Sequence, residues 1–182
     1  FYFHRKIHDG FLECDENEGK LSAMAQENLT GVRVVRAFGQ EAYERERFEK
    51  QNVKVVRTKL YVADYQLLEN PMLVIDRKQN LNELCNNVVQ DHKRFVSELQ
   101  RAKDVGIHVI VLVEHSRNIK TLEDVRHWVN PRLKVSPMAV SGERLYKILY
   151  AIQKRYECEF LFCEKSQTGK RIIEILGGKH EK

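Results

Sequence analysis

The sequence lacks the features that mark secreted, zinc-binding or membrane-spanning proteins. Its 182 residues hold four cysteines, Cys14, Cys85, Cys158 and Cys163, with no Cys-x-x-Cys pair and no histidine at zinc-finger spacing. We therefore expect reduced, mostly buried thiols, a cytoplasmic location and no structural zinc site. The longest strongly apolar run covers residues 109–113, far short of the roughly 18 residues that cross a bilayer, and no signal peptide opens the chain.

A phosphate-binding loop is also missing. Residues 166–171 contain Gly169-Lys170, but they lack the leading glycine and the spacing of a Walker motif. The chain as given therefore has no means of ATP-driven transport. It does have 42% hydrophobic residues, which suffice for a packed core in a chain of this length.

Charge is distributed unevenly along the chain. Residues 1–52 hold 8 Lys and Arg against 10 Asp and Glu, a net charge of −2, whereas residues 53–182 hold 23 against 16, a net charge of +7. The sequence pI is near 9.0. A basic second part favours a polyanionic partner such as nucleic acid, although lysine-rich surfaces also serve solubility.

The most informative stretch has the pattern of a hairpin. Two short apolar segments, residues 60–65 and 72–75, flank a polar stretch with an Asn-Pro turn signal at residues 70–71. In this hairpin Asp64 is expected at the end of the first strand, and Asp76 closes the second.

Asp64, Asp76 and Lys78 form the candidate catalytic group. Two carboxylates on adjacent strands can share hard divalent ions, Mg²⁺ or Mn²⁺, and a lysine beside them can orient or deprotonate a water or balance the charge of a scissile phosphate. Phosphodiester hydrolysis needs these parts. The same residue types also occur as turn residues and solvated strand edges, so the surrounding motif has to decide between the two interpretations.

The stretch resembles the excision-repair group-four (XPF-like) nuclease domain, whose signature is Gly-Asp, about a dozen residues, and then Glu-Arg-Lys-x-x-x-Asp. The matching residues here are Ala63-Asp64, Asp76-Arg77-Lys78 and Asn82. Asn82 lacks the negative charge of the last Asp in the signature, which leaves Glu83 as a substitute ligand to be tested. We assign residues 53–182 to this domain, which is most similar to compact stand-alone versions from phages and bacteria.

The resemblance implies a metal-dependent DNA endonuclease, in a DNA-repair type of family whose cutting is structure-selective. Asp64 and Asp76 would bind Mg²⁺ or Mn²⁺, and Lys78 would position the water or the phosphate. One alternative is a DNA-binding module of the same fold that does not cleave. DNA is the expected partner, no membrane contact is expected for residues 53–182, and a homodimer is one expected state because relatives of this fold often pair.

Four basic residues are candidates for DNA contact. Arg77 would touch a phosphate or brace the site, and Arg94 lies in an Arg-Phe pair that in the family sits on a helix with its basic residue facing the site. Arg132 and Lys134 lie on a Pro-flanked stretch that suits phosphate contact. A solvated helix face for Arg94 and a solvated loop for Arg132 and Lys134 stay open as alternatives.

The N-terminal part carries a second, unrelated resemblance. Apolar residues recur at helical spacing from residue 18 to residue 52, and residues 26–39 are similar to a cytosolic loop of ATP-binding-cassette exporters. In that family the segment is a helical extension of the membrane domain with a coupling helix. We therefore divide the chain at residues 48–53, as an apparent chimera, and a transporter transmembrane-domain fragment is a further alternative function.

The order of elements predicts the fold class. From residue 53 the patterns indicate strand, strand, helix, strand, helix, strand, helix, with Gly106 and Ser141 at helix ends and a nearly continuous apolar strand over residues 107–114. This is α/β, a restriction-endonuclease-like mixed sheet flanked by helices and preceded by a long N-terminal helical segment. Family members begin with a strand bearing an Asp-x-Arg-Glu-like element, which we do not find, so a core without its first strand is expected.

Overall fold

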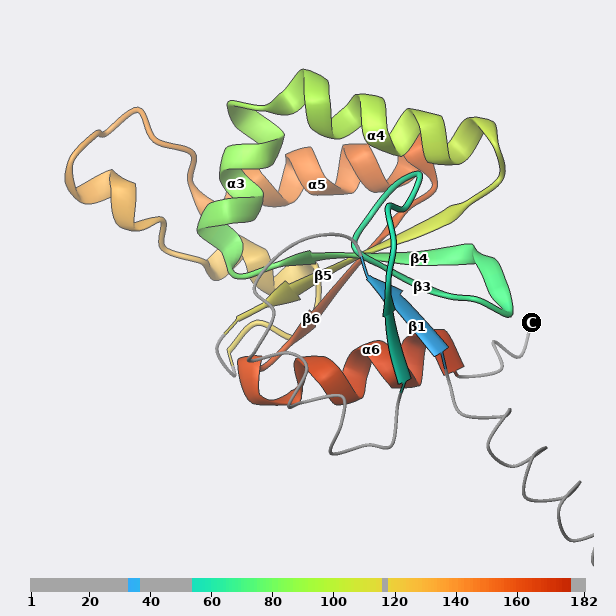
Figure 1. Ribbon diagram of the computed structural model, residues 1–182. Helices are drawn as coiled ribbons and strands as arrows, with labels where there is room; N and C mark the ends of the chain where they lie inside the picture. Colours follow the sequence, from blue (N-terminus) through green and yellow to red (C-terminus); the bar gives the residue numbers. More distant parts are fainter. Residues whose placement is uncertain (1–32, 37–53, 116–117, 178–182) are drawn as a thin grey trace, which may run out of the picture. The chain divides into compact units, whose positions relative to one another are not determined.

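The computed structural model describes residues 33–36, 54–115 and 118–177, which are built around one mixed sheet (Figure 1). The strands are β1 (Arg33–Arg36), β2 (Lys54–Arg57), β3 (Tyr65–Leu67), β4 (Asn70–Lys78), β5 (His108–Glu114) and β6 (Glu159–Cys163). They lie in the order β2-β1-β3-β4-β5-β6. β3 is antiparallel to its neighbours β1 and β4, and the other adjacent pairs are parallel.

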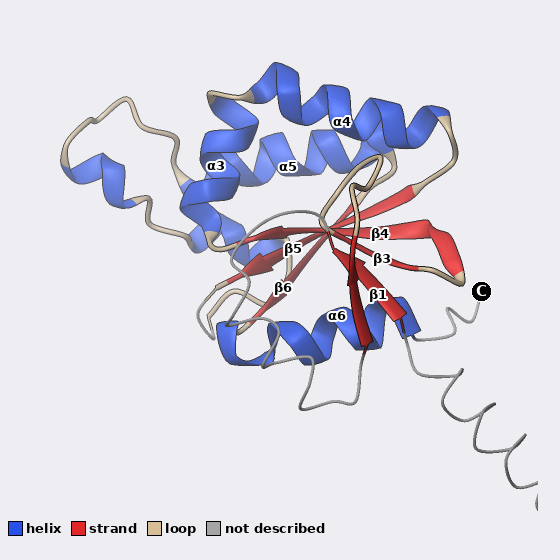
Figure 2. Ribbon diagram, viewed as in Figure 1, coloured by secondary structure: helices blue, strands red, loops and turns tan. Residues whose placement is uncertain are grey.

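Helices cover both faces of this sheet, as Figure 2 shows. The described helices are α3 (Leu81–Val89), α4 (His92–Asp104), α5 (Gly142–Tyr156) and α6 (Thr168–Gly177), with short 3₁₀ helices η1 (Glu123–His127), η2 (Pro131–Lys134) and η3 (Lys165–Gln167). α3, α4 and α5 lie on one face and α6 on the other. The connection between β5 and α5, which carries η1 and η2, extends beyond the sheet.

The alternation of side chains along β4 decides which face each candidate residue occupies. Val74 belongs to the core shared with α3, α4 and α5, whereas its neighbour Ile75 is fully buried outside that cluster, on the α6 face. Since side chains on a strand alternate between faces, Asp76 and Lys78 follow Val74 to the α4 face. Arg77 follows Ile75 to the α6 face.

Two helix ends expected from the sequence are confirmed. Gly106 follows α4 with φ of 75°, and the amides of Gly106 and Ile107 donate to the carbonyls of Lys103 and Ala102 at 3.0 and 2.9 Å, which is the Schellman pattern. Ser141 caps α5 through its hydroxyl, which accepts the Arg144 amide.

The first strand of the expected hairpin is displaced. β3 begins at Tyr65, so Asp64 precedes the strand instead of ending it, and residues 70–71 start β4 instead of forming the turn. The reason lies at Ala63, whose φ of 62° is left-handed. An extended strand cannot continue through that conformation, although the hydrophobic pattern does not reveal it.

The expected absence of a first strand is wrong. Residues 33–36, where the sequence indicated a helix, form β1, which pairs with β3 on one side and β2 on the other. Its Arg-Val-Val-Arg sequence is rich in β-branched residues, which favour strands. The rest of the expected helical segment, like Cys14, lies outside the described residues.

The described cysteines are free thiols, as expected, with Cys85 and Cys158 buried and Cys163 partly buried. Burial raises the pKa of Cys158 to about 12, so this thiol stays protonated and unreactive. Within the described part of the chain, no helix has the length and apolar character needed to cross a membrane.

Candidate active site

Asp64 and Asp76 are brought together by β4 and the turn before β3. The Asp64 amide donates to the Ile75 carbonyl, and the Asp64 Oδ2 atom accepts the Arg77 amide, both at 2.9 Å. The Asp64 side chain also interacts with the Asp76 carboxyl group. The turn therefore lays one carboxylate against the β4 segment that carries the other.

Lys78 lies beside Asp76 on the same face of β4. Its Nζ atom is 2.8 Å from each Asp76 carboxylate oxygen and 5.8 Å from the centre of the Phe95 ring on α4. Asp76 itself is only 9% exposed. The pair is therefore a largely desolvated ion pair under α4, where charge interactions are strong.

Burial shifts the ionisation of all three groups. Loss of hydration raises the pKa of Asp76 to about 7; Lys78 opposes this rise, while the charges of Asp64 and Glu98 add to it. Burial likewise raises the pKa of Asp64. Burial alone would lower the pKa of Lys78, but the carboxylates of Asp76 and Asp64 outweigh it, so the pKa is raised. Burial therefore favours the neutral forms of the two aspartates, and the charge of Lys78 opposes this effect.

This donor set fits a hard divalent ion that keeps part of its water shell. Within residues 33–36, 54–115 and 118–177, no group of three or more His, Cys, Asp or Glu side chains could hold a metal ion. Mg²⁺ commonly binds through one or two carboxylates, water and substrate phosphate. Asp64 and Asp76 would supply that minimum, and a bound cation would favour their ionised forms, which burial disfavours.

Arg77 braces the site from the other face of the sheet. Its Nη1 atom is 2.8 Å from Glu114 Oε1 on β5, and the same oxygen accepts the Thr168 hydroxyl of α6 at 2.8 Å. The Arg77 backbone holds Asp64 while its side chain anchors β4 to β5. Of the two roles expected for Arg77, bracing is the one to which these contacts correspond.

Glu83, the expected substitute ligand, serves to cap α3. Its carboxylate accepts the Gln79 amide at 2.7 Å, while its own amide donates to the Asn80 side chain at 2.9 Å. This arrangement is a variant of the capping box, in which the carboxylate accepts the amide of the residue before the N-cap Asn80. Asn82, the residue before Glu83 in α3, is exposed.

The remaining candidate DNA contacts are exposed. Arg94 lies on α4, one helical turn before Glu98, whose carboxylate accepts the Ala63 amide next to Asp64 at 3.0 Å. Arg132 and Lys134 lie in η2, in the connection that extends beyond the sheet. Arg94 thus shares a helix face with the site, and Arg132 and Lys134 do not contact Asp64 or Asp76.

Glu98 is a residue that the sequence reasoning missed. Its position one turn after Arg94 places both on the same face of a helix. That spacing was a readable signal, but the partner, Ala63, is 35 residues away in sequence.

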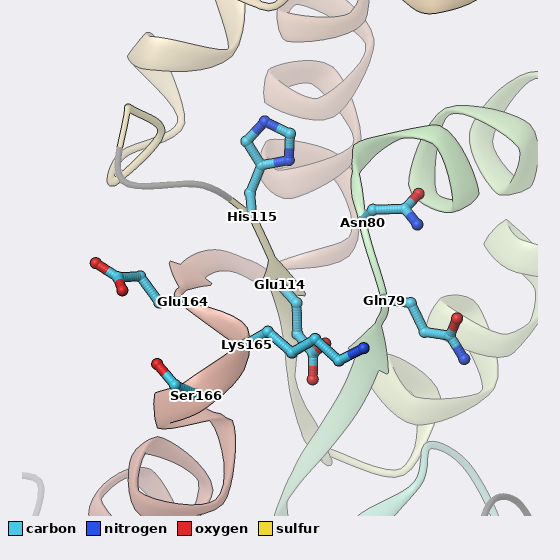
Figure 3. Close-up of a pocket in the computed structure, with 7 residues that line it drawn as sticks. All are labelled: Gln79, Asn80, Glu114, His115, Glu164, Lys165 and Ser166. Carbon is cyan, nitrogen blue, oxygen red and sulfur yellow. The ribbon is translucent and has the colours of Figure 1, made fainter.

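A separate cavity of about 490 Å³ opens where β4, β5 and β6 end. Figure 3 shows its lining residues, which are Gln79, Asn80, Glu114, His115, Glu164, Lys165 and Ser166. Glu114 and His115 point in opposite directions from the end of β5. Because Glu114 also holds Arg77, the wall of this cavity is connected to the support of Asp64.

Sequence comparison relates the N-terminal part to ABC transporters. The sequence model described as the ABC transporter transmembrane region matches residues 1–73. The chain is 41% identical over 67 residues to the uncharacterized ABC transporter ATP-binding protein YwjA of Bacillus subtilis, covering 37% of this chain and 11% of that protein. It is 36% identical over 71 residues to the ATP-dependent lipid A-core flippase of Syntrophus aciditrophicus, covering 39% and 12%. The chain spans about a tenth of the length of these relatives.

Structure comparison relates the described fold to that of XPF. XPF from Aeropyrum pernix has a TM-score of 0.57 and 17% identity, covering 79% of this chain and 63% of that one. The structure of XPF from Aeropyrum pernix in complex with DNA has a TM-score of 0.57 and 18% identity, covering 80% of this chain and 64% of that one. The chain therefore spans less than two thirds of either solved chain. At this identity the likeness shows the fold: a restriction-endonuclease-like mixed sheet flanked by helices.

Proposed function

We propose that this chain is a metal-dependent DNA endonuclease that hydrolyses phosphodiester bonds, with a preference for particular DNA structures. The observation that carries the proposal is the group of Asp64, Asp76 and Lys78 on one face of the sheet, with 2.8 Å between Lys78 and Asp76. The fold similarity to XPF, which one structure shows in complex with DNA, and the net charge of +7 over residues 53–182 support it.

The chemistry follows from the charges. Asp64 and Asp76 would hold Mg²⁺ or Mn²⁺, which supplies a Lewis acid for the phosphate and lowers the pKa of a bound water. Because the neighbouring carboxylates raise the pKa of Lys78, this lysine stays protonated at neutral pH. It therefore acts as a positive charge that positions the phosphate or the water, and not as the base. Arg94, Arg132 and Lys134 would contact the DNA backbone.

Cleavage assays on flap, fork and plain duplex DNA test the function directly. We expect cutting with Mg²⁺ or Mn²⁺, none with EDTA, and a loss of at least about 100-fold in Asp76→Asn, since metal chemistry supplies several kcal/mol of the rate. Asp104→Asn, at the exposed end of α4, removes the same charge away from the site and should cut normally.

Two outcomes would contradict the proposal. Salt-sensitive binding without cutting would support the alternative of a DNA-binding module with the same fold. Equal cutting by wild type and Asp76→Asn would place the activity outside this group.

A second candidate concerns the N-terminal part alone. The match to an ABC transporter transmembrane region supports the origin of residues 1–52 from a transporter, with the nuclease domain in residues 53–182 and a chimeric junction at 48–53. The match continues to residue 73, however, and therefore passes through this junction. Sequencing the gene across the junction from an independent source tests the chimera, and a continuous native gene would reject an assembly artefact.

A further inference from the structure

Asp64 is presented by a turn in an unfavourable backbone conformation. Ala63, directly before it, has φ of 62°, which costs a residue with a side chain about 1 to 2 kcal/mol. Such a conformation persists only where its surroundings hold it. Whatever holds Ala63 therefore also fixes the position of the Asp64 carboxylate.

α4 holds this turn at two points. Glu98 Oε1 accepts the Ala63 amide at 3.0 Å, and Glu98 is half-buried. Nearly one turn further along α4, the Arg101 guanidinium lies 5.8 Å from the centre of the Tyr61 ring. A charged acceptor makes the Glu98 bond stronger than one between neutral groups.

The other contacts of Asp64 lead only to β4. Its amide donates to Ile75 and its carboxylate accepts from Arg77. Glu98 is thus the residue through which α4 holds the Ala63 amide, directly before Asp64.

We propose that Glu98 is a positioning residue for the candidate active site: by accepting the Ala63 amide, it sets the placement of Asp64 against Asp76. This inference rests on the proposed nuclease function for its effect on catalysis. The hydrogen bond itself can be measured independently of any activity.

The test compares Glu98→Gln, which keeps the acceptor oxygen and loses the charge, with Glu98→Ala, which loses both. Gln100→Ala, at an exposed position of α4, is the matched control. For Glu98→Ala we expect amide hydrogen exchange at Ala63 to accelerate by at least about tenfold, and kcat to fall by about 10- to 100-fold with little change in KM for DNA. Glu98→Gln should restore both to within about threefold of wild type.

Each outcome has a distinct meaning. If wild type cuts DNA and Glu98→Ala cuts equally well, the positioning role is wrong. If Glu98→Gln is as damaged as Glu98→Ala, the charge acts directly and the positioning role is wrong again. If the wild-type protein does not cut DNA, the proposed nuclease function is wrong, and so is the effect of Glu98 on catalysis. If the rate of amide hydrogen exchange at Ala63 is unchanged in Glu98→Ala, Glu98 does not hold the turn. Near-wild-type circular dichroism excludes unfolding as the cause.

Discussion

Ionisation of the Asp76 carboxyl group lowers the stability of the folded chain. Its pKa is about 7 in the folded chain, against 3.8 for an ordinary aspartate. Between these values the folded state binds more protons than the unfolded state, so the free energy of unfolding falls as the pH rises. The stability is fully present below about pH 4 and is lost as the pH rises through 7.

Asp76→Asn should therefore stabilise the metal-free protein at pH 8 and have little effect at pH 4. The reason is that Asn mimics the protonated carboxyl group beside Lys78. The difference between the two pKa values of Asp76 corresponds to a gain in the free energy of unfolding of at most about 4 kcal/mol. Urea unfolding at both pH values in EDTA measures it, with Asp104→Asn as the control. A gain that does not depend on pH would show that the carboxylate charge is not its cause.

Ala63→Gly should relieve the left-handed conformation before Asp64. Glycine adopts positive φ without the cost that alanine carries, although it adds entropy to the unfolded chain. We expect a net gain of roughly 0.5 kcal/mol by urea unfolding. Ala151→Gly, at an exposed position within α5, should instead lower the free energy of unfolding by about 1 kcal/mol. Equal losses at both positions would contradict a left-handed conformation at Ala63.

At the scale of elements, α5 and η1 meet without room for a side chain. A Cβ atom on Gly142, the first residue of α5, would lie 2.5 Å from the carbonyl oxygens of Val125 and Trp128. Gly142→Ala should therefore cost about 2 to 3 kcal/mol, since backbone has to move. A Cβ atom on Gly106 would meet only Met72 Cε, at 3.5 Å. Gly106→Ala should therefore cost about 1 to 2 kcal/mol, because of the positive φ at this position. Denaturant midpoints in the reverse order would contradict the contact.

The elements that were predictable are those whose signals are local. The apolar run at 109–113 predicted the central strand β5, and Gly106 and Ser141 predicted helix ends, because each pattern acts within a few residues. β1 was missed because its two valines also fit the helical spacing of the surrounding residues. Its pairing with β3, about 30 residues further along the chain, leaves no local pattern.

The candidate site also has a part that the sequence predicted and a part that it did not. The motif at 63–78 placed Asp64, Asp76 and Lys78 together, which is how the structure has them. It did not reveal the turn at Ala63 or its contact with Glu98, since neither the sign of φ nor a hydrogen bond from another element is encoded in residue spacing. The signature that this stretch resembles has Gly at the position of Ala63, and glycine adopts a left-handed φ without the cost that alanine carries.

At the scale of the whole molecule, net positive charge should govern DNA binding. Each phosphate contact contributes about 0.9 to the slope of log affinity against log salt for duplex DNA. We expect Arg132→Ala and Lys134→Ala each to reduce that slope by about 1. Lys170→Ala on α6, where the lysine pairs with Glu174, should leave the slope unchanged. Equal slopes in all variants would show that Arg132 and Lys134 of η2 do not contact DNA phosphates.

The boundary of the folded unit is the last whole-molecule question. β1 separates β2 from β3 in the sheet, so a chain starting at residue 53 would leave β2 without a partner and expose the edge of β3. Exposed strand edges promote self-association. We expect a chain of residues 33–182 to melt as cooperatively as the intact chain, and a chain of residues 53–182 to melt roughly 5 °C lower or more and to associate in light scattering. Equal melting temperatures and a monomeric shorter chain would show that β1 adds nothing to the sheet, and would favour the boundary at residue 52 that the sequence indicates.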